Sequence, residues 1–315
     1  MSFTVECWVN SFSASVADAL VAYMTTDSSR PGWQSLWMVV ASFLFGCMGV
    51  CVKFAAENND SGEIVLWRCM IALLIVSIFM LLRRHHPRTV HLPSHAFRSL
   101  SGFSALFLYF YAITQLPLAT AVTLNYTSPI FFVMWQFVLR GVRPTRLAWV
   151  ALLLGFLGVV LLLRPTMDSD NLLGALLGLV SGGLAGLAYF HIRELGSLGE
   201  PEWRTVFYFS LFSAVGALIW VAWRGFRWPL TEDLGWLIGA GIFATGAQLS
   251  LTRAYKSGKT LLSNALAYTT VIFASLFGGL FFGERIDLGG WLAMALIITS
   301  GVMASRIRFT KAKAP

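Results

Sequence analysis

The sequence predicts an all-α integral membrane protein with ten transmembrane helices, arranged as two inverted repeats of five helices each. Three observations lead to this fold class: the composition, a regular series of apolar runs, and an internal repeat. Hydrophobic residues make up 57% of the 315 residues and charged residues only 12%, whereas an average soluble domain has about 25% charged residues. A chain this apolar cannot hide its hydrophobic surface in a water-soluble core.

Ten apolar runs follow one another from Trp33 onward. Each has about the 17–25 residues that an α-helix needs to cross a bilayer. The loops between them are short, so neighbouring helices are expected to be antiparallel, with no room for a separate soluble domain. The runs cover roughly residues 33–54, 64–82, 97–115, 118–139, 146–163, 172–191, 204–223, 233–253, 260–282 and 287–305.

Lysine and arginine residues around the runs predict the orientation in the membrane. They fall on two sides, with 17 on one side and 6 on the other, and the richer side is expected to be cytoplasmic. Arg98 and Arg253 count among the 17, and both termini are predicted on that side. The net charge of +8 is explained by this topology. A nucleic-acid surface is not indicated, because the sequence has no basic stripe interleaved with stacking aromatics.

The chain repeats itself at an offset of 142 residues. Residues 112–154, aligned without gaps on residues 254–296, give 11 identities in 43 positions, including Tyr126 with Tyr268 and Thr127 with Thr269. Because each half has five helices, an odd number, the second half must enter the membrane from the opposite side. Inverted repeats are typical of secondary transporters, whose pathway lies near the bilayer midplane between the halves. The predicted units are an N-terminal extension of unassigned role (1–32), a first repeat (33–164), a linker (165–171), a second repeat (172–305) and a basic cytoplasmic tail (306–315).

Polar side chains near the middle of apolar runs are the candidates for that pathway. They cost free energy in a bilayer unless they bind a substrate or a neighbouring helix, and both roles stay open for each of them. Together they indicate a cavity with aromatic walls and few charges, which suits a neutral or zwitterionic organic solute. The candidate pathway residues are Trp67, Arg68, Tyr109, Asn125, Tyr126, Ser128, Gln248, Asn264, Tyr268 and Thr269.

Three further features of the runs bear on binding and packing. Arg68 either binds a substrate carboxylate or phosphate, or extends to the membrane interface. Pro129 removes a backbone hydrogen bond in the fourth run, so it is expected to kink or gate that helix; the equivalent residue of the second repeat is Val271, which predicts an asymmetric hinge. In the sixth run, glycines recur at every fourth position from Gly174 to Gly186, which favours close helix packing.

A histidine-rich loop is the one metal-binding candidate. Four imidazoles could bind zinc or nickel, but two prolines among them prevent a helix from aligning them, and an ordinary cytoplasmic loop is favoured. No metal and no other cofactor is therefore predicted. The sequence also lacks HExxH, GxSxG, P-loop and GxGxxG motifs, so neither an enzyme nor ATP-driven transport is indicated. The loop histidines are His85, His86, His91 and His95.

Several local motifs agree with one transporter family. In the first repeat they are Tyr111-Ala112 with Leu116-Pro117-Leu118, the segment from Asn125 to Pro129, and the Trp149 helix with Gly155 and Gly158; in the second they are Gly283-Glu284-Arg285 and the Trp291 helix ending in Gly301-Val302. Over about residues 33–305 the chain resembles the EamA family of the drug/metabolite transporter superfamily. The resemblance implies ten helices, alternating access or facilitated flow through a central cavity, and often efflux of amino acids or related metabolites. The chain departs from the family in one place: where a Gly-Glu pair is common after the fourth helix, it has Gly141-Val142.

The predicted function is secondary transport by a carrier of the cell inner membrane. It would export or exchange a small organic metabolite, amino-acid-like or otherwise zwitterionic. Its partners would be this small-molecule substrate and the lipid bilayer, without nucleic acid, and a homodimer stays open. Two alternatives from other classes are a membrane-embedded enzyme acting on lipid or prenyl substrates and a non-transporting, metal-responsive sensor. No carboxylate lies convincingly inside a run, so proton coupling is not indicated, and a facilitator or exchanger stays open.

Overall fold

The computed structural model describes residues 31–115, 118–163, 172–225, 228–283 and 287–306, and within these ranges all regular structure is helical. Nine helical stretches there are long and apolar enough to cross a membrane. This confirms an all-α membrane protein. The helices are α2 (Pro31–Ala55), α3 (Ser61–Leu82), α4 (Leu92–Gln115), α5 (Leu118–Asn125), α6 (Ser128–Arg140), α7 (Arg146–Leu163), α8 (Leu172–Ser197), α9 (Glu202–Arg224), α10 (Leu234–Ser257), α11 (Thr260–Ala267), α12 (Thr269–Phe282) and α13 (Leu288–Arg306).

The predicted runs correspond to these helices, with two differences. The third run is α4, which has 24 residues but is not among the nine apolar stretches. The fourth and ninth runs are each broken into two helices, α5–α6 and α11–α12. The expectations for residues 1–30, the linker, the Glu284-Arg285 pair and the tail from residue 307 lie outside the described ranges.

The two breaks share a local contact. Thr127 lies between α5 and α6, and its hydroxyl donates to the carbonyl of Leu124 at 2.5 Å. The equivalent Thr269 donates in the same way to Leu266 at 2.6 Å. A side chain that bonds to a nearby backbone carbonyl competes with the regular helical hydrogen bond. The repeated threonines are therefore a feature that the two breaks share, one in each half of the chain.

A proline is not required for a break of this kind. Pro129 lies in the first turn of α6, where a helix tolerates proline because the backbone N–H there has no intrahelical partner. The break before α12 occurs without any proline, with Val271 at the position equivalent to Pro129. The chain is therefore interrupted in both halves and not only in the half with proline, whereas the kink or gate at Pro129 stays a prediction.

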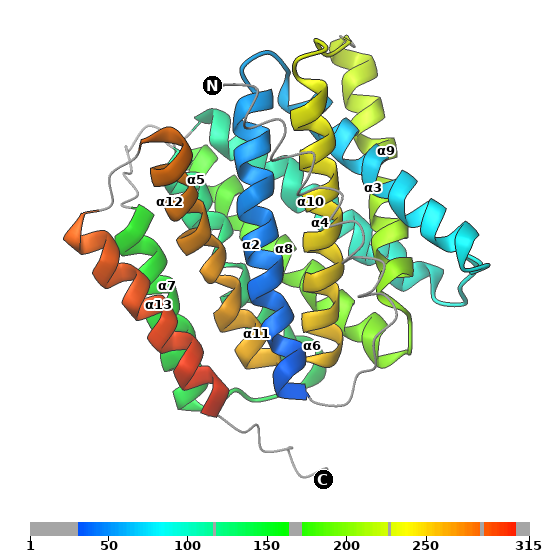
Figure 1. The fold of residues 1–315 in the computed structure, drawn as a ribbon. Coiled ribbons are helices and arrows are strands. Elements are labelled where there is room, and N and C mark those ends of the chain that lie inside the picture. The colour runs from blue at the N-terminus through cyan, green and yellow to red at the C-terminus, as the bar shows by residue number, and fades with distance from the viewer. Residues whose placement is uncertain (1–30, 116–117, 164–171, 226–227, 284–286, 307–315) are drawn as a thin grey trace.

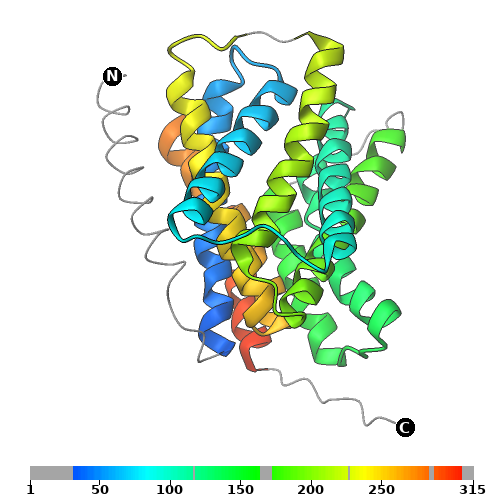
Figure 2. The same cartoon turned by 90° about the vertical axis from the view of Figure 1, so that its right-hand side faces the viewer.

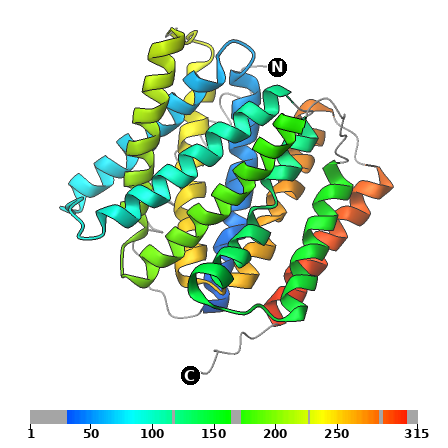
Figure 3. The same ribbon diagram turned by 180° about the vertical axis from the view of Figure 1, so that it is seen from behind.

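The helices pack in a pattern that is the same from either half. α2 packs against α10 and α12, and α8 packs against α4 and α6; α3 packs against α9, and α7 against α13. The same pairs result when each helix is replaced by its counterpart in the other half. The counterparts are α2 and α8, α3 and α9, α4 and α10, α6 and α12, and α7 and α13. Figure 1 and Figure 3 show α7 and α13 side by side at one edge, away from the α3–α9 pair. In Figure 2 most helices run broadly along one direction.

Glycines on α8 allow the broken helix α5–α6 to come close. A Cβ on Gly182 would lie 2.6 Å from the carbonyl oxygen of Leu124, and one on Gly186 would lie 2.8 Å from the backbone nitrogen of Phe132. Only glycine can accommodate backbone contacts this close. The packing role predicted for this glycine series is confirmed, and it places α8 directly against the break.

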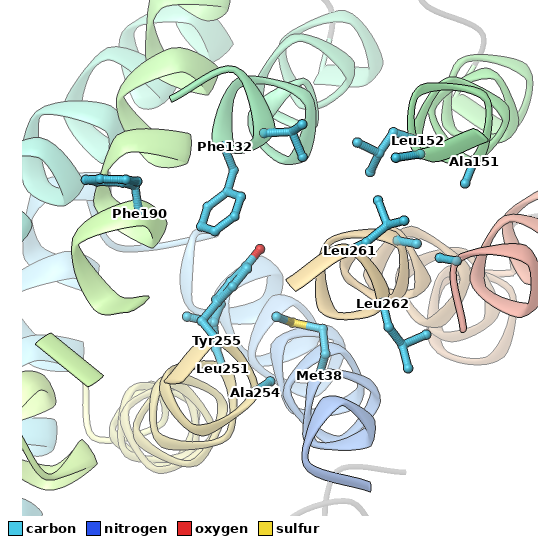
Figure 4. Packing of buried hydrophobic residues seen from close by; sticks show 14 of the residues in the cluster. Met38, Phe132, Ala151, Leu152, Phe190, Leu251, Ala254, Tyr255, Leu261 and Leu262 are labelled. Carbon is cyan, nitrogen blue, oxygen red and sulfur yellow. The ribbon is translucent and has the colours of Figure 1, made fainter. Parts of the chain in front are cut away.

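The largest apolar cluster lies between helices of both halves. It joins Met38 of α2, Phe132 of α6, Leu152 of α7 and Tyr255 of α10, as Figure 4 shows. Elsewhere large apolar side chains are exposed, for example Leu292, with 62% of its surface accessible. Exposed leucines on membrane-spanning helices are the surface expected to face lipid.

Candidate functional site

A cavity of about 340 Å³ lies between the two halves. Every described helix except α7 and α13 contributes to its lining, with the residues at the break between α5 and α6 on one side. Aromatic and methionine side chains form much of the wall, as in many small-molecule sites. Its polar lining residues are Arg68, Arg98, Tyr109, Asn125, Tyr126, Ser128, Tyr189, Gln248, Tyr255 and Thr270.

Six of the ten predicted pathway residues line this cavity, together with Pro129. They come from α3, α4, the α5–α6 break and α10, so segments far apart in the sequence meet at one place. The six are Arg68, Tyr109, Asn125, Tyr126, Ser128 and Gln248. Trp67, Asn264, Tyr268 and Thr269 are not part of its lining, and the expectation that they border it needs correction.

Tyr268 lies in a packed core rather than on the cavity wall. Its side chain is fully buried in a cluster with Val159, Met294 and Ile297. Gly155 provides the space for it, because a Cβ there would lie 2.5 Å from the Tyr268 ring. The mirrored tyrosines therefore differ in environment: Tyr126 borders the cavity and Tyr268 packs between α7 and α13.

The other three residues contact neighbouring helices. Trp67 packs on the cluster formed by Ala55, Ile64 and Leu237. The Thr269 hydroxyl donates a hydrogen bond to the carbonyl oxygen of Leu266. Asn264 is fully buried behind the cavity wall, where its Oδ1 accepts a hydrogen bond of 3.0 Å from the Tyr255 hydroxyl.

Polar contacts join the two halves at the α5–α6 break. Asn125 Nδ2 donates to Ser181 Oγ on α8 at 3.2 Å. The polar side chains of Ser128 and Tyr189 both line the cavity, as do those of Tyr126 and Thr270. Each of these pairs has one residue from the first half and one from the second, so a relative movement of the halves must change the polar contacts at the cavity.

Tyr255 fixes the wall formed by α10. Its ring stacks between Tyr189 and Phe132, with centroid distances of 5.0 and 5.3 Å. The ring is fully buried and the hydroxyl is held by Asn264, so both ends of the side chain are constrained. A sequence-based search missed this residue because it lies two positions beyond the predicted eighth run.

Arg98 is a buried cavity residue and not a charge that flanks the membrane. Only 2% of its surface is exposed, and its Nη2 donates to Gln248 Oε1 at 3.2 Å. The helix α4 starts at Leu92 instead of the predicted residue 97, which places Arg98 inside it. Pro93 in the first turn is the sequence feature that indicates the earlier start. Arg253 is likewise buried and bonded to Gln34 at 2.7 Å.

The histidine loop and the start of α4 form a polar cluster with Glu200, in which His95 and Glu200 are buried. Glu200, between α8 and α9, accepts hydrogen bonds from Thr89 and, at 2.7 Å, from Arg204 Nη1. Its carboxylate lies 3.5 Å from His95 Nε2, while His85 stacks on Trp203. Within the described ranges no group of three or more histidine, cysteine or acidic side chains could hold a metal ion.

The arrangement is suited to binding a small molecule. The described lining of the cavity has two arginines, four tyrosines, amides and hydroxyls, but no carboxylate and no histidine. General acid–base catalysis needs a titratable pair within reach of the reacting atoms. These residues can instead hold a small molecule by charge, hydrogen bonds and aromatic contact.

Comparison with known proteins identifies the family. The model of the EamA-like transporter family matches residues 32–164 and again residues 172–306. The chain belongs to the EamA-like transporter family. The resemblance predicted from the motifs is thus confirmed, and the protein is a multi-pass membrane protein of a transporter family.

Several characterised relatives of this family member are transporters. The pseudopaline exporter CntI of Pseudomonas aeruginosa is 30% identical, covering 87% of this chain and 96% of its own. The riboflavin transporter of Rhizobium johnstonii is 25% identical, covering 93% of this chain and 97% of its own. A crystal structure of another protein, 18% identical, shares the fold with a TM-score of 0.79, covering 88% of this chain and 99% of its own.

Proposed function

We propose that the protein is a secondary transporter of the cell inner membrane that exports or exchanges a small organic metabolite through the cavity between its two halves. The observation that carries the proposal is the cavity itself. It is lined from both halves, beside a helix that is broken in the middle of the membrane span. Broken helices at the interface of two repeats are where secondary transporters bind substrates.

The symmetric packing supports an inverted repeat. Equivalent helices make equivalent contacts, and α6 and α12 both end at a glycine with positive φ, Gly141 at 66° and Gly283 at 68°. Each half has five membrane-crossing segments, counting each broken helix as one. Two such halves of opposite orientation can exchange their roles, which gives a cavity open first to one side and then to the other.

The named relatives support transport more than catalysis. One is a pseudopaline exporter and another is a riboflavin transporter. Because these two substrates differ in structure, the family is expected to accept diverse organic substrates. A membrane-embedded enzyme has less support, because the described cavity lining offers no acid–base pair. A sensor based on the histidine loop has less support too, because the described loop residues form no metal-binding group.

A comparison of metabolites tests the proposed function. Cells that lack the gene are compared with cells that carry it on a plasmid, and small molecules are quantified in the cytoplasm and the medium. We expect at least one organic metabolite to accumulate inside the deletion strain and to exchange across proteoliposomes that contain the purified protein. Equal metabolite pools in both strains, with no exchange in proteoliposomes, would contradict transport.

The mirrored tyrosines supply a matched pair of variants for the same assay. Tyr126→Phe removes a hydroxyl from a residue that lines the cavity, and we expect the flux to fall about five- to tenfold, as for a lost hydrogen bond of about 1 kcal/mol or more. Tyr268→Phe removes a buried hydroxyl that has no hydrogen-bond partner among the described residues. It is expected to keep the flux and to leave the melting temperature unchanged or higher.

A further inference from the structure

Arg98 carries a charge that the described residues do not neutralise. Its guanidinium lies over the Phe209 ring, 3.8 Å from the centroid, and bonds to the neutral amide of Gln248. Its Nε is buried without a hydrogen-bond partner in the described ranges. A buried cation held only by a ring and an amide is incompletely compensated for its loss of water.

Arg68 adds a second positive charge to the same cavity. It lines the cavity from α3, with 9% of its surface exposed. Both arginines belong to the lining of this one cavity, so their like charges share a confined space. No carboxylate belongs to the described lining. The described part of this site therefore contains no negatively charged side chain that could neutralise the two arginines.

The rest of the cavity fits an organic body rather than a bare inorganic ion. Aromatic and thioether side chains, among them Phe45, Met48 and Tyr109, form the wall around the two arginines. The volume of about 340 Å³ is large enough for a metabolite with several non-hydrogen groups. Guanidinium groups bind carboxylate and phosphate oxygens in pairs, with charge-assisted hydrogen bonds.

From this geometry we infer that the cavity binds an organic anion with two negative charges, whose carboxylate or phosphate oxygens lie between Arg68 and Arg98 while its apolar part contacts the aromatic wall. The inference rests on the proposed transport function and assigns its substrate class. It replaces the neutral or zwitterionic solute that the sequence favoured. Gln248 is a positioning residue, because it acts on the substrate by orienting Arg98.

The test measures binding to the purified protein in detergent, without any transport. The probes are phthalate, its neutral diamide phthalamide, phenyl phosphate and inorganic phosphate, compared at equal ionic strength by the melting temperature and by calorimetry. We expect phthalate or phenyl phosphate to raise the melting temperature and phthalamide to have no effect. A response to phthalate assigns carboxylates; a response to phenyl phosphate and inorganic phosphate, but not to phthalate, assigns phosphate.

Variants locate the binding. Arg68→Gln and Arg98→Gln should each weaken the binding of the anionic probe about tenfold or more, as for a lost charge-assisted hydrogen bond. Arg98→Lys, which keeps the charge without the planar fork, should lose less. Arg140→Gln is the matched control, because Arg140 is 48% exposed and pairs with Glu194 outside the cavity; its binding should equal that of the unaltered protein.

The melting temperature without ligand separates a binding role from a structural one. If the arginines serve substrate binding, removing an uncompensated buried charge should leave the ligand-free protein equally stable or more stable. The inference is overturned if the anions stabilise the protein no more than phthalamide, or if both arginine variants retain the response. It is also overturned if the metabolite exchanged by proteoliposomes is neutral and its flux does not depend on Arg68 or Arg98, although transport itself would then stand. Anion binding without any metabolite exchange would instead refute the proposed transport and leave the anion site in place.

Discussion

Glu200 connects three segments through one buried carboxylate. Only 4% of its surface is exposed, and it contacts Thr89 and His95 from the histidine loop and α4, and Arg204 from α9. Burial by itself would raise the pKa of this carboxyl group. The hydrogen bonds from Thr89 and Arg204 and the neighbouring positive charges outweigh burial, so the pKa of Glu200 lies below its ordinary value of 4.5.

The lowered pKa makes a pH-dependent contribution to stability. A carboxyl group with a depressed pKa in the folded state stabilises the fold above its unfolded pKa, and this stabilisation is lost as the pH falls through the folded value. Glu200→Gln should therefore lower the free energy of unfolding by about 1–3 kcal/mol at pH 7. The difference from the unaltered protein should shrink as the pH falls below about 4.5, the ordinary value. Thermal melting in detergent between pH 7 and pH 3.5 measures both effects.

Glu202 supplies the control for this experiment. It pairs with Lys256 at 3.4 Å, with 28% and 22% of the two side chains exposed. Exposed ion pairs contribute about 1 kcal/mol or less, so Glu202→Gln should shift the melting temperature less than Glu200→Gln at pH 7. Equal shifts in the two variants at every pH would show that the buried cluster gives no special stabilisation.

Single residues were the hardest part to predict from the sequence. The polar residues around Asn125 lie at the cavity because the break itself borders it, and there the local sequence is informative. Tyr126 and Tyr268 are each followed by a threonine and pack in the same apolar cluster, but only Tyr126 lines the cavity, which no local pattern reveals. Arg98 was counted among the cytoplasmic charges because the predicted run began only one residue before it, whereas α4 begins at Leu92 and places Arg98 deeper in the helix.

At the level of the element, the two broken helices share a threonine and not a proline. Pro129→Ala should leave the α5–α6 break intact, since α11–α12 breaks without proline. We expect the flux of this variant to stay within about twofold, with a stability change of about 1 kcal/mol or less. Thr127→Val removes the hydroxyl that bonds Leu124 and should reduce the flux more. A larger loss in Pro129→Ala than in Thr127→Val, measured in the same proteoliposomes, would restore proline as the cause.

Helix α8 offers a second test at this scale, because adjacent glycines on it differ in their surroundings. Gly182→Ala would place a methyl group 2.6 Å from the Leu124 carbonyl oxygen, whereas the nearest atom to a methyl group on Gly183 is 3.8 Å away, on the Phe131 ring. Overpacking costs about 1–3 kcal/mol, so Gly182→Ala should lower the melting temperature and the flux. Gly183→Ala is the control, and its values should match those of the unaltered protein.

The whole molecule was the most predictable scale. Apolar runs of bilayer length define the helices, since in a membrane the backbone can satisfy its hydrogen bonds only within each segment. The repeat at an offset of 142 residues predicted which helices are equivalent, and the packing pairs of the structure follow that equivalence. The position of the cavity could not be predicted in detail, because it depends on how tilted helices from both halves meet.

The orientation of the two halves in the membrane is the last property of the whole molecule to be tested. The loop after α2 and the loop after α8 are equivalent in the two halves, yet they lie at opposite ends of the bundle: Asn59 bonds to Asp233 at one end, and Glu200 bonds to Thr89 at the other. An inverted repeat with cytoplasmic termini therefore places Glu57 outside the cell and Ser197 inside it. Arg88 should share the side of Ser197, and Glu232 the side of Glu57.

Thiol labelling of intact cells distinguishes these positions. In a variant with its four cysteines replaced by serine, single cysteines are introduced as Glu57→Cys, Glu232→Cys, Arg88→Cys and Ser197→Cys, all at exposed positions. A membrane-impermeant maleimide should label the first two in intact cells and the last two only after permeabilisation. The reverse pattern would place both termini outside. Labelling of Glu57→Cys and Ser197→Cys from the same side would contradict the inversion, because equivalent loops of an inverted repeat must face opposite sides of the bilayer.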